Sequence, residues 1–465
     1  MKYSKSLLTN EIDRIRKEIG HDEVKIFIKQ ILFDDNTNTI WIITEDRGSK
    51  SAIIGKGGWV VGRLREDLNI KKIHVESHSD FILKKYQIEL SLRKVDSFIK
   101  IMNIQIKKTL VKCDSENLTN SNHNNKVEPN DNNEAKFDDD NNVLMKIDDT
   151  IVNKDLTGIL NLKKLLESRI NQIYNFNMEK YLNKELLSIH GINIKDKNEN
   201  NNYENNGNRL KKDNINRYKE NTDGINWNNI NEDRINGNSV NCDSLNEHEL
   251  HNPELKHQSV VALSGGVDSS FSLILAKYLG FTPIAVTIDP GTIILPKVFK
   301  NNIDNLIKNL GVEHHYLKRD YSSIIEDSFN GKFHPCGRCS SMTGKNIFEF
   351  AYKKGVNLVI FGDLLSTGCQ CLTENKIRFN NSEEITMFRL NLPATLSIGK
   401  EEIREFTSKF HVKKIKGFGC PLLHEAHKKY HHIKKFSIQR ILRETRSGAL
   451  EPGEALEQIW SFYKT

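Results

Sequence analysis

One short segment of this 465-residue chain has the residue types needed to hold phosphate groups. It follows an apolar run, Val260 to Leu263, and precedes apolar residues at helical spacing. Its two glycines let the backbone approach a ligand closely, and the free N–H groups at a helix start attract an anion. Hydroxyl groups and one carboxylate surround the turn, which reads Ser264-Gly265-Gly266-Val267-Asp268-Ser269-Ser270. The segment is predicted to bind a nucleotide. A strand, turn and helix in which Gly and Ser serve only as turn and cap is the alternative.

The sequence of this loop differs from that of the kinase-type phosphate loop, which needs a lysine in the pattern G-x-x-x-x-G-K-[ST]. Residues 264–269 instead resemble the PP-loop of the ATP pyrophosphatase superfamily, whose members split ATP into AMP and pyrophosphate to adenylylate a substrate. The resemblance implies ATP and Mg²⁺ as ligands. It assigns nucleotide binding to Ser264, Gly265, Gly266, Val267, Asp268, Ser269, Ser270 and Asp289. It assigns catalysis to Asp268, Ser269 and Asp363.

Cysteines in the last third of the chain form a second set of reactive residues. Cys336 and Cys339 make a C-x-x-C pair, and Cys420 follows much later. This set resembles the three-cysteine pattern of the iron–sulfur tRNA thiolation enzymes in the same superfamily. The resemblance implies that the three thiolates bind a [4Fe-4S] cluster and leave one iron open to sulfide.

Other interpretations of these cysteines stay open. A zinc site would need a fourth protein ligand. It could come from Cys369, Cys371, His334 or His424. Cys336 and Cys339 could also be a redox pair that cycles through a persulfide or disulfide, as in thiolation enzymes lacking a cluster. Buried, inert thiols are the remaining alternative.

Near the N-terminus, alternating apolar and polar residues from Glu23 to Ile43 predict a β-hairpin with its turn at residues 34–38. A helical pattern broken by glycines follows, and residues 72–76 predict a short strand. This order resembles a KH domain, whose G-x-x-G loop between two helices clamps the backbone of single-stranded nucleotides. The resemblance implies RNA contacts by Gly55, Lys56, Gly57 and Gly58. A glycine turn between packed helices is the alternative, and Trp59 departs from the family pattern.

The stretch from His424 to Arg446 is rich in Lys and Arg and poor in acidic residues. Helical spacing would gather many of these cations on one face. Beside a KH-like module, contact with an RNA backbone is favoured over a solvated surface. The residues assigned to RNA here are Lys428, Lys429 and Arg440.

Strand and helix patterns alternate from residue 258 onward, with helices predicted at 297–310 and 345–354. Such alternation predicts an α/β domain with a doubly wound parallel sheet and ligands at the carboxyl ends of the strands. By resemblance this is the fold of the PP-loop, adenine nucleotide alpha hydrolase-like domains. Asp289 and Gly362-Asp363 follow two predicted strands, so they should line the same crevice as the loop. Either Asp could equally be a helix cap.

Composition divides the chain into three parts. Residues 1–112 form the KH-like α+β domain, and residues 258–465 form the nucleotide domain with its basic C-terminal extension. Residues 113–257 are so rich in Asn and so poor in aromatic residues that a largely disordered linker is expected. Leucines at helical spacing in residues 156–187 are a possible helical island. The absence of a signal peptide and of long apolar runs predicts a cytoplasmic protein without membrane contact.

These patterns favour an ATP-dependent tRNA sulfurtransferase that adenylylates a base carbonyl and replaces its oxygen with sulfur. The partners implied are tRNA and a sulfur donor, either free sulfide or a sulfur-carrier protein, and a homodimer stays open. One alternative is a PP-loop small-molecule sulfurtransferase or an amide-forming ligase of the NAD-synthetase kind. The other is a non-catalytic RNA-binding protein that senses nucleotide.

Overall fold

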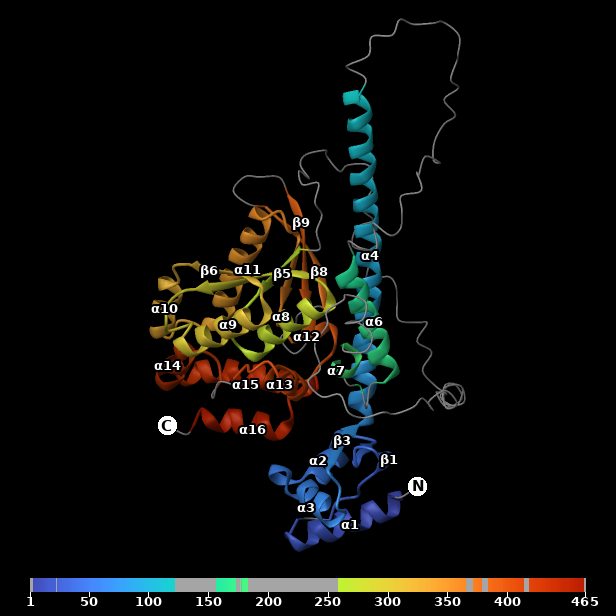
Figure 1. Ribbon diagram of the computed structural model, residues 1–465. Coiled ribbons are helices and arrows are strands. Elements are labelled where there is room, and N and C mark those ends of the chain that lie inside the picture. The colour runs from blue at the N-terminus through green and yellow to red at the C-terminus, as the bar shows by residue number, and fades with distance from the viewer. Residues whose placement is uncertain are drawn as a thin grey trace, which may run out of the picture. The chain divides into compact units, whose positions relative to one another are not determined.

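The computed structural model describes residues 3–21, 23–121, 156–172, 176, 178–182, 258–364, 371–378, 384–413 and 418–463. Within these residues the chain forms a three-stranded sheet near the N-terminus and a six-stranded sheet in its second half (Figure 1). Each sheet has its own helices and its own apolar core.

The N-terminal sheet has the order β1-β2-β3, with β1 antiparallel and β3 parallel to β2. Its elements are α1 (Lys5–Glu18), β1 (Ile28–Asp34), β2 (Thr39–Thr44), α2 (Arg47–Ile54), α3 (Trp59–Asp67) and β3 (Lys72–Ser77). Leu8, Ile12 and Ile15 recur on one face of α1 and are fully buried in the core of this sheet, as amphipathic spacing requires. The predicted hairpin is therefore present, although β1 begins later than the alternation suggested.

The second sheet has the order β6-β5-β4-β7-β9-β8, and all neighbours are parallel except β8 and β9. Its strands are β4 (Gln258–Ala262), β5 (Thr282–Asp289), β6 (Glu313–Lys318), β7 (Leu358–Phe361), β8 (Leu372–Ile377) and β9 (Ile385–Asn391). Strands such as β5 are apolar and buried along nearly their whole length, as expected for a parallel sheet covered on both faces. The predicted parallel α/β sheet is confirmed.

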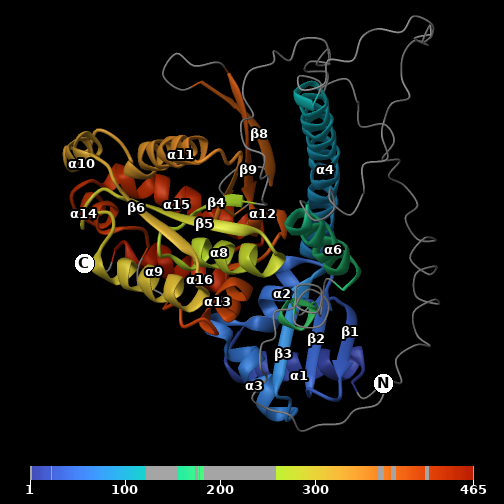
Figure 2. The same ribbon diagram turned by 45° about the horizontal axis from the view of Figure 1, so that its top comes forward.

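Helices cover both faces of this sheet (Figure 2). On one face lie α8 (Val267–Leu279) and α9 (Lys297–Leu310), with α13 (Lys400–Ser408) packed against α8. On the other lie α10 (Ser322–Phe329) and α11 (Pro335–Lys353). The remaining helices of this domain are α12 (Leu392–Thr395), α14 (Pro421–Lys429), α15 (His431–Arg446) and α16 (Pro452–Ser461).

Three further helices lie outside the alternating pattern: α4 (His78–Ser121), α6 (Thr157–Asn171) and α7 (Met178–Tyr181). The predicted helical island contains α6, whose Leu162, Leu165 and Leu166 are fully buried in the core that also holds α8. Asn161 fixes the contact by donating to the Leu279 carbonyl at 3.0 Å. Most of the predicted linker lies outside the described residues, so its disorder stays a prediction, but α6 belongs to the nucleotide-domain core.

Two local expectations are corrected by the structure. Helix α11 begins at Pro335, not near residue 345, so Cys336 and Cys339 lie inside its first turns. The basic C-terminal stretch is two helices, α14 and α15, and its cations do not share one face. Lys434 is buried and donates to the Phe462 carbonyl at 2.8 Å.

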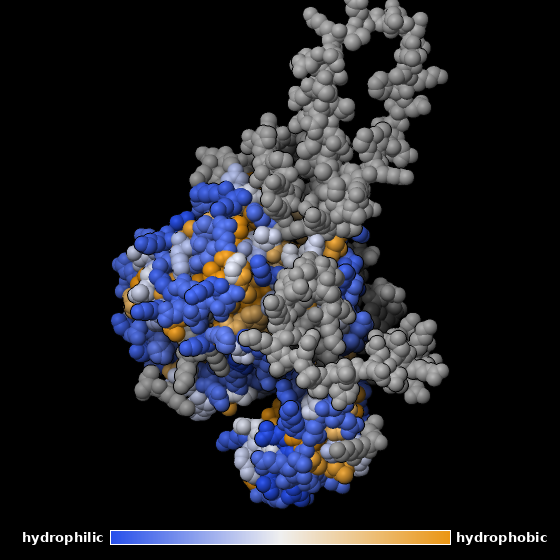
Figure 3. Space-filling view, viewed as in Figure 1, coloured by the Kyte–Doolittle hydropathy of each residue, from blue (hydrophilic) through white to orange (hydrophobic). Residues whose placement is uncertain are grey.

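The face seen in Figure 3 is largely hydrophilic and is interrupted by small hydrophobic patches. Among the described residues, none of the helices has the length and apolar character needed to cross a membrane.

Candidate active site

The predicted phosphate loop joins the end of β4 to the first turn of α8. Ser269 closes the loop on itself, because its Oγ accepts from the Ser264 N–H and donates to the Gly266 carbonyl, both at 3.1 Å. Gly266 precedes α8 and has no side chain to cap it. Since the first N–H groups of a helix lack intrahelical acceptors, those of α8 are available to an anion in the loop.

Two close backbone contacts hold this loop in place. Gly265 has a φ of +78°, and a Cβ there would lie 2.6 Å from the Phe299 carbonyl oxygen of α9. Gly362, at the end of β7, packs so closely on α8 that a Cβ would lie 2.7 Å from the Ser269 nitrogen. Residues 264–269 therefore form a closely packed phosphate cradle. Neither Gly265 nor Gly362 can be replaced by a larger residue unless the neighbouring backbone moves.

Asp268 has an unsatisfied polar atom inside this cradle. Its Oδ1 is buried and has no hydrogen-bond partner among the described residues. Burial raises the pKa of Asp268, and the nearby cations Lys400 and Arg440 only partly offset this. A carboxylate oxygen next to a phosphate cradle is the ligand type that Mg²⁺ prefers. The residues present therefore fit Mg-ATP. Ser270 is also buried, and its Oγ has no partner in the described part of the chain.

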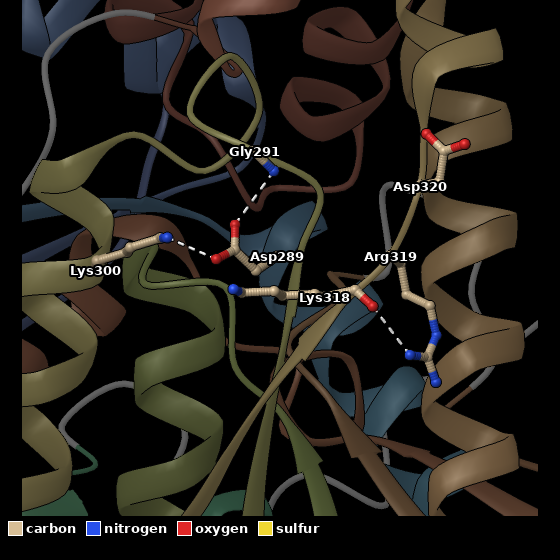
Figure 4. Close-up of a pocket in the computed structure, with 6 residues that line it drawn as sticks. All are labelled: Asp289, Gly291, Lys300, Lys318, Arg319 and Asp320. Carbon is tan, nitrogen blue, oxygen red and sulfur yellow. Dashed lines mark hydrogen bonds and ion pairs between the residues drawn. The ribbon is translucent and has the colours of Figure 1, made fainter.

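Asp289 lies at the carboxyl end of β5, in a pocket of about 390 Å³. Figure 4 shows Lys300 and Lys318 pointing toward its carboxylate from α9 and from the end of β6. Lys300 Nζ lies 2.6 Å from one oxygen, and the Gly291 N–H donates to the other at 3.2 Å. Burial would raise the pKa of Asp289, but these two hydrogen bonds outweigh it and lower the pKa. Since Lys300 follows Phe299 on α9, this pocket adjoins the loop.

Asp363 lies at the carboxyl end of β7, one residue after the glycine that packs on α8. Its carboxylate forms an ion pair with Arg389 of β9. The Arg389 guanidinium also stacks over the Phe361 ring, 3.9 Å from its centroid. Asp363 thus has an ordered position close to Asp268, whose pKa it helps to raise.

The three cysteines of the predicted cluster come together from separate segments. Cys336 and Cys339 lie at the start of α11, and Cys420 immediately precedes α14. Cys336 and Cys420 pack against the same small apolar cluster, formed by Leu423, Ala426 and Ile433. Residues far apart in the sequence therefore share one half-buried site.

Burial disfavours the thiolate form of two of these cysteines. It raises the pKa of Cys336 to about 12 and that of Cys339 to about 11, and neighbouring thiols add to both shifts. A bound metal would reverse this, because coordination stabilises the thiolate. Within the described residues, no three His, Cys, Asp or Glu side chains converge tightly enough to hold a single ion. A four-iron cluster is larger, and its thiolates bind different irons, so three grouped thiols are a suitable donor set.

Other predicted ligands are placed differently. His334 uses both ring nitrogens: Nδ1 accepts from the Cys336 N–H at 3.4 Å, and Nε2 lies 2.9 Å from Ser437 Oγ. Cys371 is buried in the core that holds α8 and β9. His424 is exposed, and Cys369 lies outside the described residues. His334 and Cys371 are therefore positioned by other contacts and are poor candidates for a fourth ligand.

In the N-terminal module, the G-x-x-G loop separates α2 from α3 as the sequence predicted. Gly55, Gly57 and Gly58 all have positive φ, and a Cβ at Gly57 or Gly58 would meet no atom within 4 Å. Lys56 is exposed at the tip, and the Trp59 side chain is 53% exposed. Trp59 therefore does not pack into the core, and its ring is available to a ligand.

The three predicted RNA contacts of the basic C-terminal stretch divide into two kinds. Lys428 pairs with Glu425 on the surface, and Lys429 lies over the Phe329 ring. Arg440 is half-buried, pairs with Glu444, and lowers the pKa of Cys336 against the effect of burial. Sequence reasoning did not identify Lys300 or Lys400 as site residues. No local motif marks either one, and only the folded chain brings them to the carboxylates.

No family model matches the chain. Over 206 residues the chain is 37% identical to an uncharacterized protein, MJ1638, of Methanocaldococcus jannaschii, covering 44% of this chain and 74% of that protein. Over 109 residues it is 34% identical to tRNA-cytidine(32) 2-sulfurtransferase 1 of Francisella tularensis, covering 22% of this chain and 40% of that enzyme. A solved structure, the U34-tRNA thiolase NcsA from Methanococcus maripaludis with its [4Fe-4S] cluster, aligns at 14% identity with a TM-score of 0.28, covering 44% of this chain and 71% of that one.

Proposed function

Because this chain belongs to the PP-loop ATP pyrophosphatase superfamily, in one family with the Methanocaldococcus protein, we propose that it is an ATP-dependent tRNA sulfurtransferase. The observation that supports this most is the grouping of Cys336, Cys339 and Cys420 in the domain that carries the nucleotide cradle. The similarity of one stretch to a tRNA-cytidine sulfurtransferase agrees with it.

In the first half-reaction, the carbonyl oxygen of a tRNA base attacks the α-phosphorus of ATP, and the bond from that phosphorus to pyrophosphate breaks. Negative charge then grows on the departing pyrophosphate. The first N–H groups of α8, those of residues 267–269, would face this charge before the reaction begins, which is where fixed donors contribute most. Asp268 would hold Mg²⁺ on the same phosphates.

In the second half-reaction, a sulfur at the oxidation level of sulfide attacks the activated base carbon. The carbon–oxygen bond to AMP breaks, its electron pair leaves on AMP, and the sulfur's proton passes to solvent. Cys336, Cys339 and Cys420 would hold a [4Fe-4S] cluster, which supplies an iron with a free coordination position for sulfide. Lys56, Lys428 and Lys429 would hold the RNA backbone.

The experiment that tests this proposal measures iron and acid-labile sulfide in protein purified without oxygen. Wild type is compared with Cys336→Ser, Cys339→Ser, Cys420→Ser and the matched control Cys371→Ala. About four irons per chain are expected in wild type and in the control, with loss in the other three variants. The same proteins are then given ATP, sulfide and unmodified tRNA, and pyrophosphate and thiolated nucleosides are quantified.

Each component of the proposal can fail separately. Pyrophosphate release without any iron would favour a redox-cysteine enzyme or an amide-forming ligase. Iron without pyrophosphate release on any RNA would favour a nucleotide sensor. Iron loss in Cys371→Ala as well would extend the ligand set beyond the three grouped cysteines.

A further inference from the structure

Arg440 lies on α15, close enough to both Asp268 and Cys336 to influence their pKa values. Its Nε donates to Glu444 Oε1 at 3.3 Å, one turn further along the helix. Its guanidinium carbon lies 5.8 Å from the centroid of the Phe418 ring. Phe418 packs in the same apolar cluster as Cys336 and Cys420. The Arg440 side chain is thus held from two sides and differs from the solvated cations on the surface.

Glu444 anchors this arginine to the rest of the site. Its side chain is completely buried, and its second oxygen lies 2.7 Å from Lys400 Nζ at the start of α13. One carboxylate therefore binds two cations, and the group Lys400–Glu444–Arg440 has a net positive charge. Both cations are only partly buried, and Asp268 is a further carboxylate near them. An anionic ligand would be attracted to the charge that Glu444 leaves unbalanced.

Arg440 influences residues assigned to both half-reactions, the nucleotide-binding Asp268 and the cysteine Cys336. On one side it opposes the burial that raises the pKa of Asp268. On the other it acts on the pKa of Cys336 and helps to lower that of His334. Its two terminal nitrogens have no hydrogen-bond partner among the described residues, and 39% of the side chain is exposed. These nitrogens present the planar, two-pronged donor geometry that suits a phosphate group.

We propose that Arg440 binds the α-phosphate of the nucleotide, in ATP and in the adenylylated substrate, while the loop holds the β- and γ-phosphates. The inference rests on the proposed function for the substrate that becomes adenylylated. Binding of the nucleotide itself by Arg440 does not depend on which substrate that is. When sulfur displaces AMP, the carbon–oxygen electron pair ends on this phosphate, and Arg440 is the cation beside it. The α-phosphate is thereby fixed on the side of the cradle that faces the cysteines.

The test measures dissociation constants for AMP, pyrophosphate and tRNA by calorimetry, on full-length protein purified without oxygen. The variants are Arg440→Ala, Arg440→Lys and the control Arg443→Ala, an exposed arginine on the same helix. Arg440→Ala should weaken AMP binding about tenfold or more, the size of one charge-assisted hydrogen bond, and leave pyrophosphate binding unchanged. Arg440→Lys keeps the charge next to Glu444 and guards against misfolding, and it should lose part of the AMP affinity. Arg443→Ala should bind AMP like wild type.

Three outcomes would overturn the inference: unchanged AMP affinity in both Arg440 variants, an equal loss in Arg443→Ala, or a loss confined to tRNA. The last would make Arg440 an RNA contact. Because AMP binding is measured without sulfide or turnover, the inference can stand when thiolation is not found. It can likewise fail when thiolation is found.

Discussion

The two glycine-rich loops of this chain both contain glycines with a positive φ, and they differ in their surroundings. Gly57 and Gly265 have φ angles of +64° and +78°, a region that favours glycine. A Cβ at Gly57 would meet open space, whereas one at Gly265 would meet the backbone of α9 at 2.6 Å. In the loop at residues 55–58, glycine is needed for the positive φ and leaves room for a ligand. In the loop at residues 264–269, glycine is needed in addition because a side chain would collide with the backbone of α9. An open loop suits a long ligand that arrives from solvent, and a packed cradle suits a small ligand of fixed shape.

The largest expected effect is that of Gly265→Ala. Positive φ costs a non-glycine residue about 1–2 kcal/mol, and overpacking against Phe299 adds about 1–3 kcal/mol. The free energy of unfolding should fall by the sum, and ATP binding should be lost. Gly355→Ala is the matched control, because Gly355 has a φ of +70° and no atom near its Cβ position. Urea unfolding of both variants measures the difference. Equal losses would show that close packing of the cradle is not required.

An intermediate effect is expected for Asp268→Asn. Burial raises the pKa of Asp268, so between about pH 4 and the raised value the native state binds more protons than the unfolded chain. The free energy of unfolding therefore falls as pH increases through this window. The variant should be more stable than wild type at pH 8, and its stability should depend less on pH, while Mg-ATP binding weakens. Thermal unfolding from pH 4 to 8 and calorimetry with Mg-ATP measure both. A variant less stable than wild type at pH 8 would contradict the assignment.

The smallest effect is expected at the open loop, for Lys56→Ala. Loss of one phosphate contact should weaken RNA binding severalfold and reduce the slope of log affinity against log salt by about 1. Stability and ATP binding should not change, since Lys56 is exposed. A salt series of binding measurements with single-stranded RNA checks this. An unchanged slope would leave the loop as a simple turn between α2 and α3, and the KH-like assignment would lose its main support.

The sequence alone determined the local elements of the nucleotide domain. Helix α9 has the predicted bounds, Lys297–Leu310, because Pro296 precedes its first residue and Gly311 follows its last in a left-handed conformation. The strand, loop and helix around residues 258–279 were readable for the same reason. Apolar runs, glycines and caps act over a few residues, and the order of these elements predicts a parallel sheet.

Tertiary structure alone decided which of these residues meet. The apolar face of α6 gave no sign of its partner, yet it packs in the core beside α8. The number of cations in residues 424–446 predicted that Arg440 shares one basic surface with Lys428, whereas in the folded chain Arg440 is half-buried, pairs with Glu444 and influences the pKa of Cys336. Such contacts depend on the packing of helices across long chain separations. Spacing along the sequence does not encode that packing locally, so the site had to be read from the folded chain.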